Sequence, residues 1–134
     1  MNAQQIRLVQ ETWSRTLSLD NDPGEIFYSE LFTLAPELRQ LFVHDMREQS
    51  RKFTSMITFL AFKLDRLEEV MQDAADLGKR HKAYKVPEVS YDSVYQALIN
   101  TLHKVLGDEW NAETESDWHE IYLQLSQAMQ SVEA

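Results

Sequence analysis

Three side chains in this sequence carry groups that together suit the capture of a small ligand at a metal centre: His81, Tyr28 and Gln49. A neutral imidazole nitrogen is a good donor to iron, and a phenol O–H and an amide N–H can each donate a hydrogen bond. Pro36 and Phe42 lie between Tyr28 and Gln49, and the other residues expected around the three are apolar. Few polar groups in an apolar lining predict a pocket for a flat, apolar ligand that carries iron.

Each of these residues also has an ordinary interpretation when it is taken alone. His81 is flanked by Arg80 and Lys82, as a surface histidine would be. Tyr28 could be a core tyrosine whose hydroxyl is bonded elsewhere, and Gln49 could be a solvated residue near the start of a helix. The hypothesis of a site therefore depends on whether the elements of the fold bring the three side chains together.

The elements that must position these residues are helices, because apolar residues recur at spacings of three and four along the whole chain. The first helix is expected to bury Ile6, Val9, Trp13 and Leu17. Asp22 followed by Pro23 predicts a capped helix start. This second helix is expected to carry Ile26, Phe27, Leu31 and Phe32. Further helices are expected at about 36–42, 46–64, 67–84, 91–105 and 118–129. His81 lies on the 67–84 helix, and Gly107 is a plausible helix stop.

Composition places the chain among soluble globular domains, with 43% apolar residues and only 3 Gly and 3 Pro. The absence of cysteine excludes disulfides and thiolate sites, and it fits a reducing cytoplasm. The net charge of −9 argues against nucleic acid as a partner. No segment approaches the roughly 18 apolar residues of a membrane span, and the N-terminus has no signal region. We expect a cytoplasmic protein that binds neither nucleic acid nor membranes.

Several segments in order resemble the globin family. The run Phe-Tyr-Ser-Glu-Leu-Phe at 27–32 and the run Pro-Glu-Leu-Arg-Gln-Leu-Phe at 36–42 resemble the second and third helices of a globin. Residues 48–52 and 77–84 resemble the distal and proximal helices of bacterial single-domain haemoglobins, flavohaemoglobin globin domains and neuroglobin. The resemblance covers nearly the whole chain. It implies one all-α globin domain over residues 1–134, a three-over-three helical sandwich with a shortened corner before the distal helix.

On the proximal side, the resemblance implies that His81 is the axial ligand of the iron of haem b. The carbonyl of Leu77, one helical turn earlier, is a candidate acceptor for the other ring N–H of this histidine. Tyr91 matches a tyrosine that orients the histidine in flavohaemoglobins, and Glu133 lies close to the place of a glutamate that completes their network. Val86 is expected to contact the haem.

On the distal side, Tyr28 and Gln49 match the polar pair of bacterial globins, which would donate hydrogen bonds to bound dioxygen as it gains negative charge. Phe42 matches the phenylalanine that wedges against the haem face, although ordinary core packing predicts it as well. Phe53 departs from the family, which usually has Leu or Val there; its ring either narrows the distal cavity or turns aside.

The charged residues and the other histidines are less specific. Lys52 and Arg80 flank the expected haem edge and could pair with its propionates, although solvated charges explain them equally well, since exposed pairs contribute about 0–1 kcal/mol. His44 would be a second iron ligand only if the corner folds inward, and a surface role is the simpler expectation. His103 and His119 are expected to be structural.

The function implied by the resemblance is reversible binding of dioxygen at a haem, with nitric oxide and carbon monoxide as further diatomic ligands. Enzymatic nitric oxide dioxygenation is also implied, with electrons from a separate reductase, since 134 residues leave no room for a flavin domain. Two rivals remain. One is a haem-based sensor, a class usually fused to an output module, and the other is a haem-free globin-fold interaction module. A Soret absorption band in the purified protein would exclude the haem-free interaction module and leave the haem hypotheses.

Overall fold

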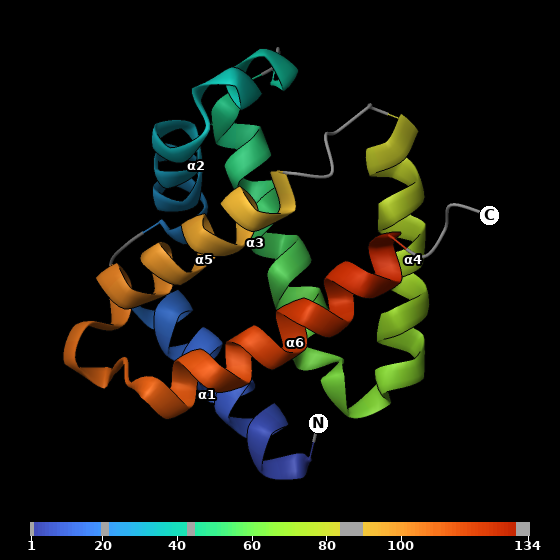
Figure 1. The fold of residues 1–134 in the computed structure, drawn as a ribbon. Coiled ribbons are helices and arrows are strands. Elements are labelled where there is room, and N and C mark those ends of the chain that lie inside the picture. The colour runs from blue at the N-terminus through green and yellow to red at the C-terminus, as the bar shows by residue number, and fades with distance from the viewer. Residues whose placement is uncertain (1, 20–21, 43–44, 84–89, 131–134) are drawn as a thin grey trace.

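The computed structural model of the chain describes residues 2–19, 22–42, 45–83 and 90–130, and their secondary structure is helical throughout. Figure 1 shows the order of the elements along the chain. They are α1 (Ala3–Ser18), α2 (Pro23–Leu34), the 3₁₀ helix η1 (Pro36–Leu41), α3 (Met46–Phe62), η2 (Leu64–Arg66), α4 (Leu67–Ala83), α5 (Ser90–Leu106), η3 (Gly107–Glu109) and α6 (Ala112–Gln130). Only residues 42–45 separate η1 from α3, so the corner before α3 is short, as the sequence predicts.

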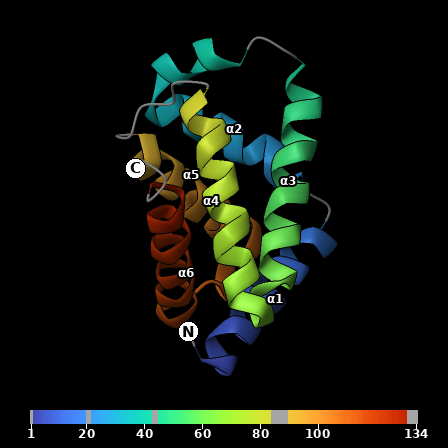
Figure 2. The same ribbon diagram turned by 90° about the vertical axis from the view of Figure 1, so that its right-hand side faces the viewer.

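The six α-helices form two layers of three, with α1, α3 and α4 against α2, α5 and α6 (Figures 1 and 2). The strongest packing joins α2 to α5, α4 to α6 and α2 to α3. The core between the layers is apolar, and its most deeply buried large side chains include Trp13, Leu64, Val70 and Leu102. None of the described helices is long and apolar enough to cross a membrane.

The helix starts follow from local capping chemistry. The Asp22 carboxylate accepts a hydrogen bond from the backbone N–H of Glu25 at 3.2 Å, with Pro23 in the first turn, which confirms the predicted start of α2. Gly107 has φ = +56°, a left-handed conformation that glycine adopts without steric cost, and it directly follows the end of α5. This confirms the predicted stop.

Two expectations about the buried face are wrong in detail. Leu17 was expected in the core but is 39% exposed, whereas Thr16 is fully buried in its place. Burial of Thr16 is tolerated because its hydroxyl donates to the carbonyl oxygen of Thr12 at 2.8 Å. The helix expected over 46–64 ends at Phe62, and the buried Leu64 belongs to the separate turn η2.

Two indole N–H groups fasten α1 to its neighbours inside the core. Trp13 donates to the hydroxyl of Thr58 on α3, and Trp118 of α6 donates to the hydroxyl of Thr12, both at 2.9 Å. Among the described residues, every buried side-chain nitrogen and oxygen has a hydrogen-bond partner. Besides filling the core, Trp13 therefore links α1 to α3 within one layer, and Trp118 links α6 to α1 across the two layers.

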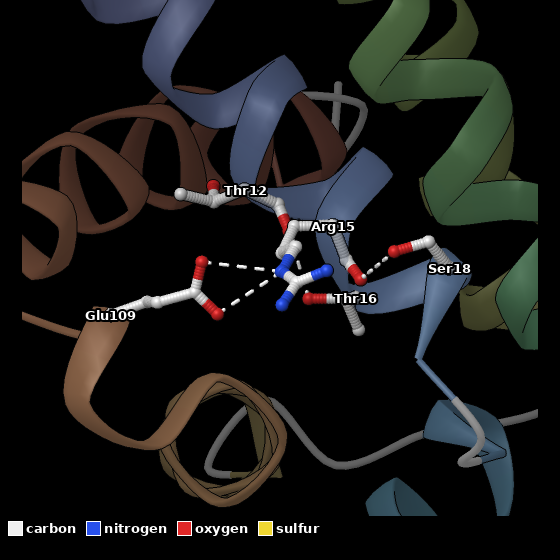
Figure 3. A network of polar contacts seen from close by, with 5 residues as sticks. All are labelled: Thr12, Arg15, Thr16, Ser18 and Glu109. Carbon is white, nitrogen blue, oxygen red and sulfur yellow. Dashed lines mark hydrogen bonds and ion pairs between the residues drawn. The ribbon is translucent and has the colours of Figure 1, made fainter.

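At the surface, α1 is tied to η3 by one ion pair (Figure 3). The Arg15 Nε lies 3.1 and 3.2 Å from the two carboxylate oxygens of Glu109. Both side chains are about half exposed, so the pair contributes about 0–1 kcal/mol. It orients the corner after α5 without carrying much stability.

Two glycines permit close helix crossings near the residues of interest. A Cβ at Gly24 would lie 2.3 Å from the carbonyl oxygen of Ser50, so α2 and α3 touch backbone to backbone there. A Cβ at Gly78 would lie 2.1 Å from the carbonyl oxygen of Met129, which places α4 equally close to α6. Neither position tolerates a larger residue without displacement of a helix.

Candidate ligand-binding site

A cavity of about 140 Å³ lies inside the sandwich, where α3 and α4 face α5 and α6. Among the described residues that line it, only Tyr91, Tyr122 and Ser126 carry a hydroxyl group. The lining is otherwise formed mainly by apolar side chains, among them Phe27, Phe53, Met56, Ile57, Leu60, Ala74, Leu77, Val94, Leu98, Ile121, Leu125 and Met129. An apolar lining with a few polar groups is typical of a cofactor site.

Tyr28 and Gln49 meet beside this cavity, although 20 residues separate them in the sequence. The side-chain amide of Gln49 donates a hydrogen bond to the Tyr28 hydroxyl, with 3.0 Å between Nε2 and the phenolic oxygen. The crossing of α2 and α3 explains the meeting: Gly24 is one turn before Tyr28, and Ser50 is next to Gln49. Because the phenolic oxygen accepts from Gln49, the O–H proton of Tyr28 is left for another acceptor.

Aromatic rings surround the Tyr28 side chain, which is only 7% exposed. The ring centroids of Phe27, Phe32, Phe42 and Phe53 lie 5.0, 5.8, 5.2 and 5.8 Å from that of Tyr28. Burial raises the pKa of the Tyr28 phenol above its usual 10.0, and the hydrogen bond from Gln49 opposes this more weakly. The phenol therefore stays protonated at neutral pH and keeps its donor.

Phe53 lies between the polar pair and the cavity. It is buried, it lines the cavity, and its ring stacks on that of Phe27 with a centroid distance of 3.9 Å and an interplanar angle of 10°. The ring is also edge-on to Tyr28. Of the two orientations that the sequence left open, the structure shows the ring turned inward.

On the opposite wall, α4 contributes Ala74 and Leu77 to the cavity. Position 81 follows Leu77 by one helical turn and so shares the helix face that borders the cavity. The backbone of His81 is helical, whereas its side chain is outside the described part of the structure. Val86, His44 and Glu133 are outside the described residues altogether, so their expected roles remain predictions.

Tyr91 lines the cavity from the start of α5, close to where the sequence expects the proximal side. Its backbone carbonyl accepts a hydrogen bond from the hydroxyl of Tyr122 on α6. The sequence predicted Tyr122 only as a core residue and missed this bond. The apolar spacing of the last helix identifies the buried face but gives no indication of which hydroxyl finds which carbonyl.

The remaining candidates lie at the surface. Lys52 is exposed and pairs with Glu48 at 3.6 Å, one turn away on the same helix, and Arg80 is exposed on α4. His103 and His119 are exposed, and neither lines the cavity. Their rings lie against Trp110 and Tyr95 respectively.

The sequence pattern of the globin family matches residues 25–129, which include the cavity walls α2 to α6. The chain belongs to the globin family. Members of this family bind haem and diatomic gases, so this chain is a globin in which haem is the expected cofactor. The structure agrees with this assignment in its helical sandwich and in the apolar cavity where α3 and α4 face α5 and α6.

Three proteins from different organisms have sequences similar to this chain. An uncharacterised globin-like protein of Aquifex aeolicus is 24% identical over 99% of this chain and 94% of its own length. Leghemoglobin of Medicago sativa is 27% identical over 95% of this chain and 94% of its own. A flavohemoprotein of Halalkalibacterium halodurans is 25% identical over 72% of this chain, but the match spans only 24% of that longer protein.

Among solved structures, the fold is similar to that of an engineered carbene transferase, which is named as a candidate nitric oxide dioxygenase from Rhodothermus marinus. The TM-score is 0.84, and the match covers 98% of this chain and 92% of the other. With 21% sequence identity, this likeness shows the fold alone.

Proposed function

We propose that residues 1–134 form one haem-binding unit in which His81 holds the iron of haem b, and that the globin binds dioxygen reversibly on the opposite face. The observation that carries the proposal is the hydrogen bond from Gln49 to Tyr28 in an aromatic enclosure beside the cavity. A buried polar pair of this kind, next to an otherwise apolar space, is suited to hold a small ligand that gains negative charge.

The residues present fit a haem by their chemistry. The lining from α3, α4, α5 and α6 would cover the flat apolar faces of the ring, and position 81 lies on the cavity-facing side of α4. We assign the carbonyl of Leu77 as acceptor for the second ring N–H of His81, Tyr91 and Val86 as proximal contacts, and Lys52 and Arg80 as partners of the propionates. A bound ferrous haem would supply the site at which dioxygen binds.

The chain's own contribution on the distal side is a directed donor. Gln49 donates one of its two N–H groups to the Tyr28 oxygen, which holds the phenol in place with its O–H available, so we infer that Tyr28 is the direct donor to the ligand and that Gln49 fixes the phenol orientation. The sequence suggested that both side chains donate to the ligand, and we refine that hypothesis by this division of roles. Phe42 and Phe53 keep water away from the phenol, which strengthens its hydrogen bond.

The test is the dissociation rate of dioxygen from the Tyr28→Phe variant. A hydrogen bond to a charged group contributes about 1.5–3 kcal/mol, so its loss should speed dissociation by about tenfold or more. Carbon monoxide gains much less charge and should dissociate at nearly the same rate as before. Tyr95→Phe, which removes a hydroxyl remote from the pair, is the matched control.

If both gases change equally in Tyr28→Phe, the tyrosine acts by occupying space and the donor assignment is wrong. If Gln49→Leu has a smaller effect of the same sign, the positioning role of Gln49 is supported. A larger effect from Gln49→Leu than from Tyr28→Phe would reverse the two roles.

Nitric oxide dioxygenation is a second candidate, favoured by the protonated Tyr28 donor and by the names of the flavohemoprotein and of the Rhodothermus marinus protein. It would need electrons from a reductase that these 134 residues do not contain. Consumption of nitric oxide with formation of nitrate, in the presence of a reducing system, would support it. An absence of nitrate formation by a protein that binds dioxygen would leave reversible binding as the function.

A further inference from the structure

The charges of this chain are unevenly distributed along its sequence. Residues 47–52 and 79–82 contain 6 of the 13 lysines and arginines but only 1 of the 22 aspartates and glutamates. The remaining 7 basic and 21 acidic residues give the rest of the chain a net charge of −14. A strongly acidic protein therefore carries two short basic segments, one in the first turns of α3 and one at the end of α4.

These two segments, together called the basic end, lie at the same end of the molecule. Figures 1 and 2 both show the start of α3 and the end of α4 at the top, whereas α1, α4 and α6 begin at the opposite end. The first turns of α4 and α6 carry two acidic residues each. The charge of the molecule is thus positive at one end and negative at the other.

Most basic side chains at this end have no acidic partner. Those that are exposed and have no ion pair within the described residues are Arg47, Arg51, Lys79 and Arg80. The carboxylates beside the start of α3 are already engaged: Asp45 accepts a hydrogen bond from the backbone N–H of Arg47 at 2.9 Å, and Glu48 lies 3.6 Å from Lys52. Positive charge is therefore available to a partner.

Outside the basic end, most of the basic side chains are neutralised by neighbours. The ion pairs join Arg15 to Glu109, Lys63 to Asp73, Arg66 to Glu69 and Lys104 to Glu30, at 2.9 to 3.8 Å. The attraction that this protein exerts on an anionic partner therefore comes mainly from the basic end.

We propose that the basic end is the docking surface for an acidic protein electron donor that carries its own one-electron centre, such as a flavin. The inference rests on the proposed haem site and names its partner, because position 81 and Gln49 lie at the same end. In each docking event the centre of the donor is oxidised by one electron and ferric iron is reduced to the ferrous state. No atom or proton needs to be exchanged.

The charge distribution favours a compact protein over an extended anionic surface. Exposed charges act over about 8 Å at physiological ionic strength, so a small acidic protein can meet the basic end alone. An anionic membrane or a nucleic acid would also face the acidic remainder of the chain, which repels it. Steering by opposite charges raises association rates by about 10- to 1000-fold at low salt and orients the partner before contact.

The first experiment follows the reduction of the ferric haem-loaded protein by reduced flavodoxin, a small acidic flavoprotein, in a stopped-flow instrument. The variant Arg47→Glu/Lys79→Glu reverses one charge on each basic segment. Its matched control, Arg7→Glu/Arg66→Glu, makes the same change of net charge on α1 and η2. At low salt the first variant should be reduced about tenfold more slowly than the unmodified protein, and the control should change much less. High salt should remove the difference.

Two further measurements report on docking itself. Titration calorimetry of oxidised flavodoxin into the ferric protein should show binding at low salt that Arg47→Glu/Lys79→Glu loses and the control keeps. Carbodiimide, which joins lysines to carboxylates that touch, should link flavodoxin to Lys52 or Lys79 by mass spectrometry. Links confined to Lys63 or Lys104 would place the partner elsewhere and overturn the proposal.

An uncharged small reductant separates docking from damage to the haem site. Photoreduced deazariboflavin needs no docking surface, so it should reduce all three proteins at the same rate. Equal slowing of Arg47→Glu/Lys79→Glu by both reductants would mean that these residues act on the haem site, and equal slowing of both variants by flavodoxin would mean that net charge alone matters. Either result overturns the proposal.

The failures of the two proposals differ. A protein without a Soret band refutes haem binding itself. A protein with a normal Soret band and reversible dioxygen binding, but with no salt-dependent binding of flavodoxin, refutes the docking surface while the proposed function stands. If the protein instead binds phosphatidylglycerol vesicles, and Arg47→Glu/Lys79→Glu abolishes that binding, the basic end serves a membrane and the donor assignment is wrong.

Discussion

At the scale of single residues, the orientation of one hydrogen bond determines how the distal side would work. The amide of Gln49 donates one of its two N–H groups to Tyr28, so the phenol oxygen accepts within the pair and its own O–H can donate outward. The types of both residues could be predicted from the sequence, because a phenol and an amide at these positions suit a charged ligand. The direction of the hydrogen bond between Gln49 and Tyr28 could not be predicted, since it depends on how α2 and α3 approach each other in three dimensions.

Phe53 gives a residue-scale prediction about ligand entry. Its buried ring stands between the Tyr28 enclosure and the cavity, so Phe53→Leu should open space and speed carbon monoxide association severalfold. Dissociation of dioxygen should change much less, because Tyr28 and Gln49 are retained. Flash photolysis of both proteins under the same conditions measures the association rates.

The control for this variant is Phe59→Leu, which makes the same change on the same helix. Phe59 is 54% exposed and does not line the cavity, so this variant should associate with carbon monoxide like the unmodified protein. An unchanged rate in Phe53→Leu would mean that ligands enter by another route. A slower rate would contradict the steric role outright.

At the scale of elements, the site depends on two helix crossings with no room for a side chain. Capping at Asp22 and the stop at Gly107 could be predicted, because they are local signals read within a few residues. The contact of Gly24 with Ser50 could not be predicted, because a glycine inside a helical pattern does not indicate which helix packs against it. The same holds for Gly78 and Met129.

Gly24→Ala tests whether the crossing of α2 and α3 positions the distal pair. The added methyl group would meet the Ser50 carbonyl at 2.3 Å, so the helices must separate, at a cost of about 1–3 kcal/mol of stability. Because Tyr28 and Gln49 flank the crossing, dioxygen should also dissociate faster. Urea unfolding and stopped-flow dissociation measure the two effects.

Gly107→Ala provides the comparison. Its methyl group would meet nothing within 4 Å, but the left-handed backbone costs about 1–2 kcal/mol for a residue with a side chain. This variant should lose stability without any change in dioxygen dissociation. If Gly24→Ala behaves the same way, the crossing supports the fold but does not position the pair.

At the scale of the whole molecule, the all-helical fold could be predicted from the apolar residues that recur every three or four positions. The membership of the chain in the globin family follows from the ordered motifs over residues 25–129. The correction at Leu17 and Thr16 is local, because these residues follow Trp13 by four and three positions and so lie on either side of the same helix stripe. The contact between the rings of Tyr122 and Tyr95 could not be predicted, because those rings come from different helices and meet only after α5 packs on α6.

The central claim is that His81 binds haem in this cavity and that the ferrous form takes up dioxygen reversibly. The direct measurement is the absorption spectrum of the haem-reconstituted protein, recorded without oxygen, in oxygen and after oxygen removal, for the unmodified chain and for His81→Ala. We predict a Soret band that shifts on oxygenation and returns on deoxygenation in the unmodified chain, and little or no retained haem in the variant. A chain that takes up no haem, or a His81→Ala variant with an unchanged ferrous spectrum, would contradict the account.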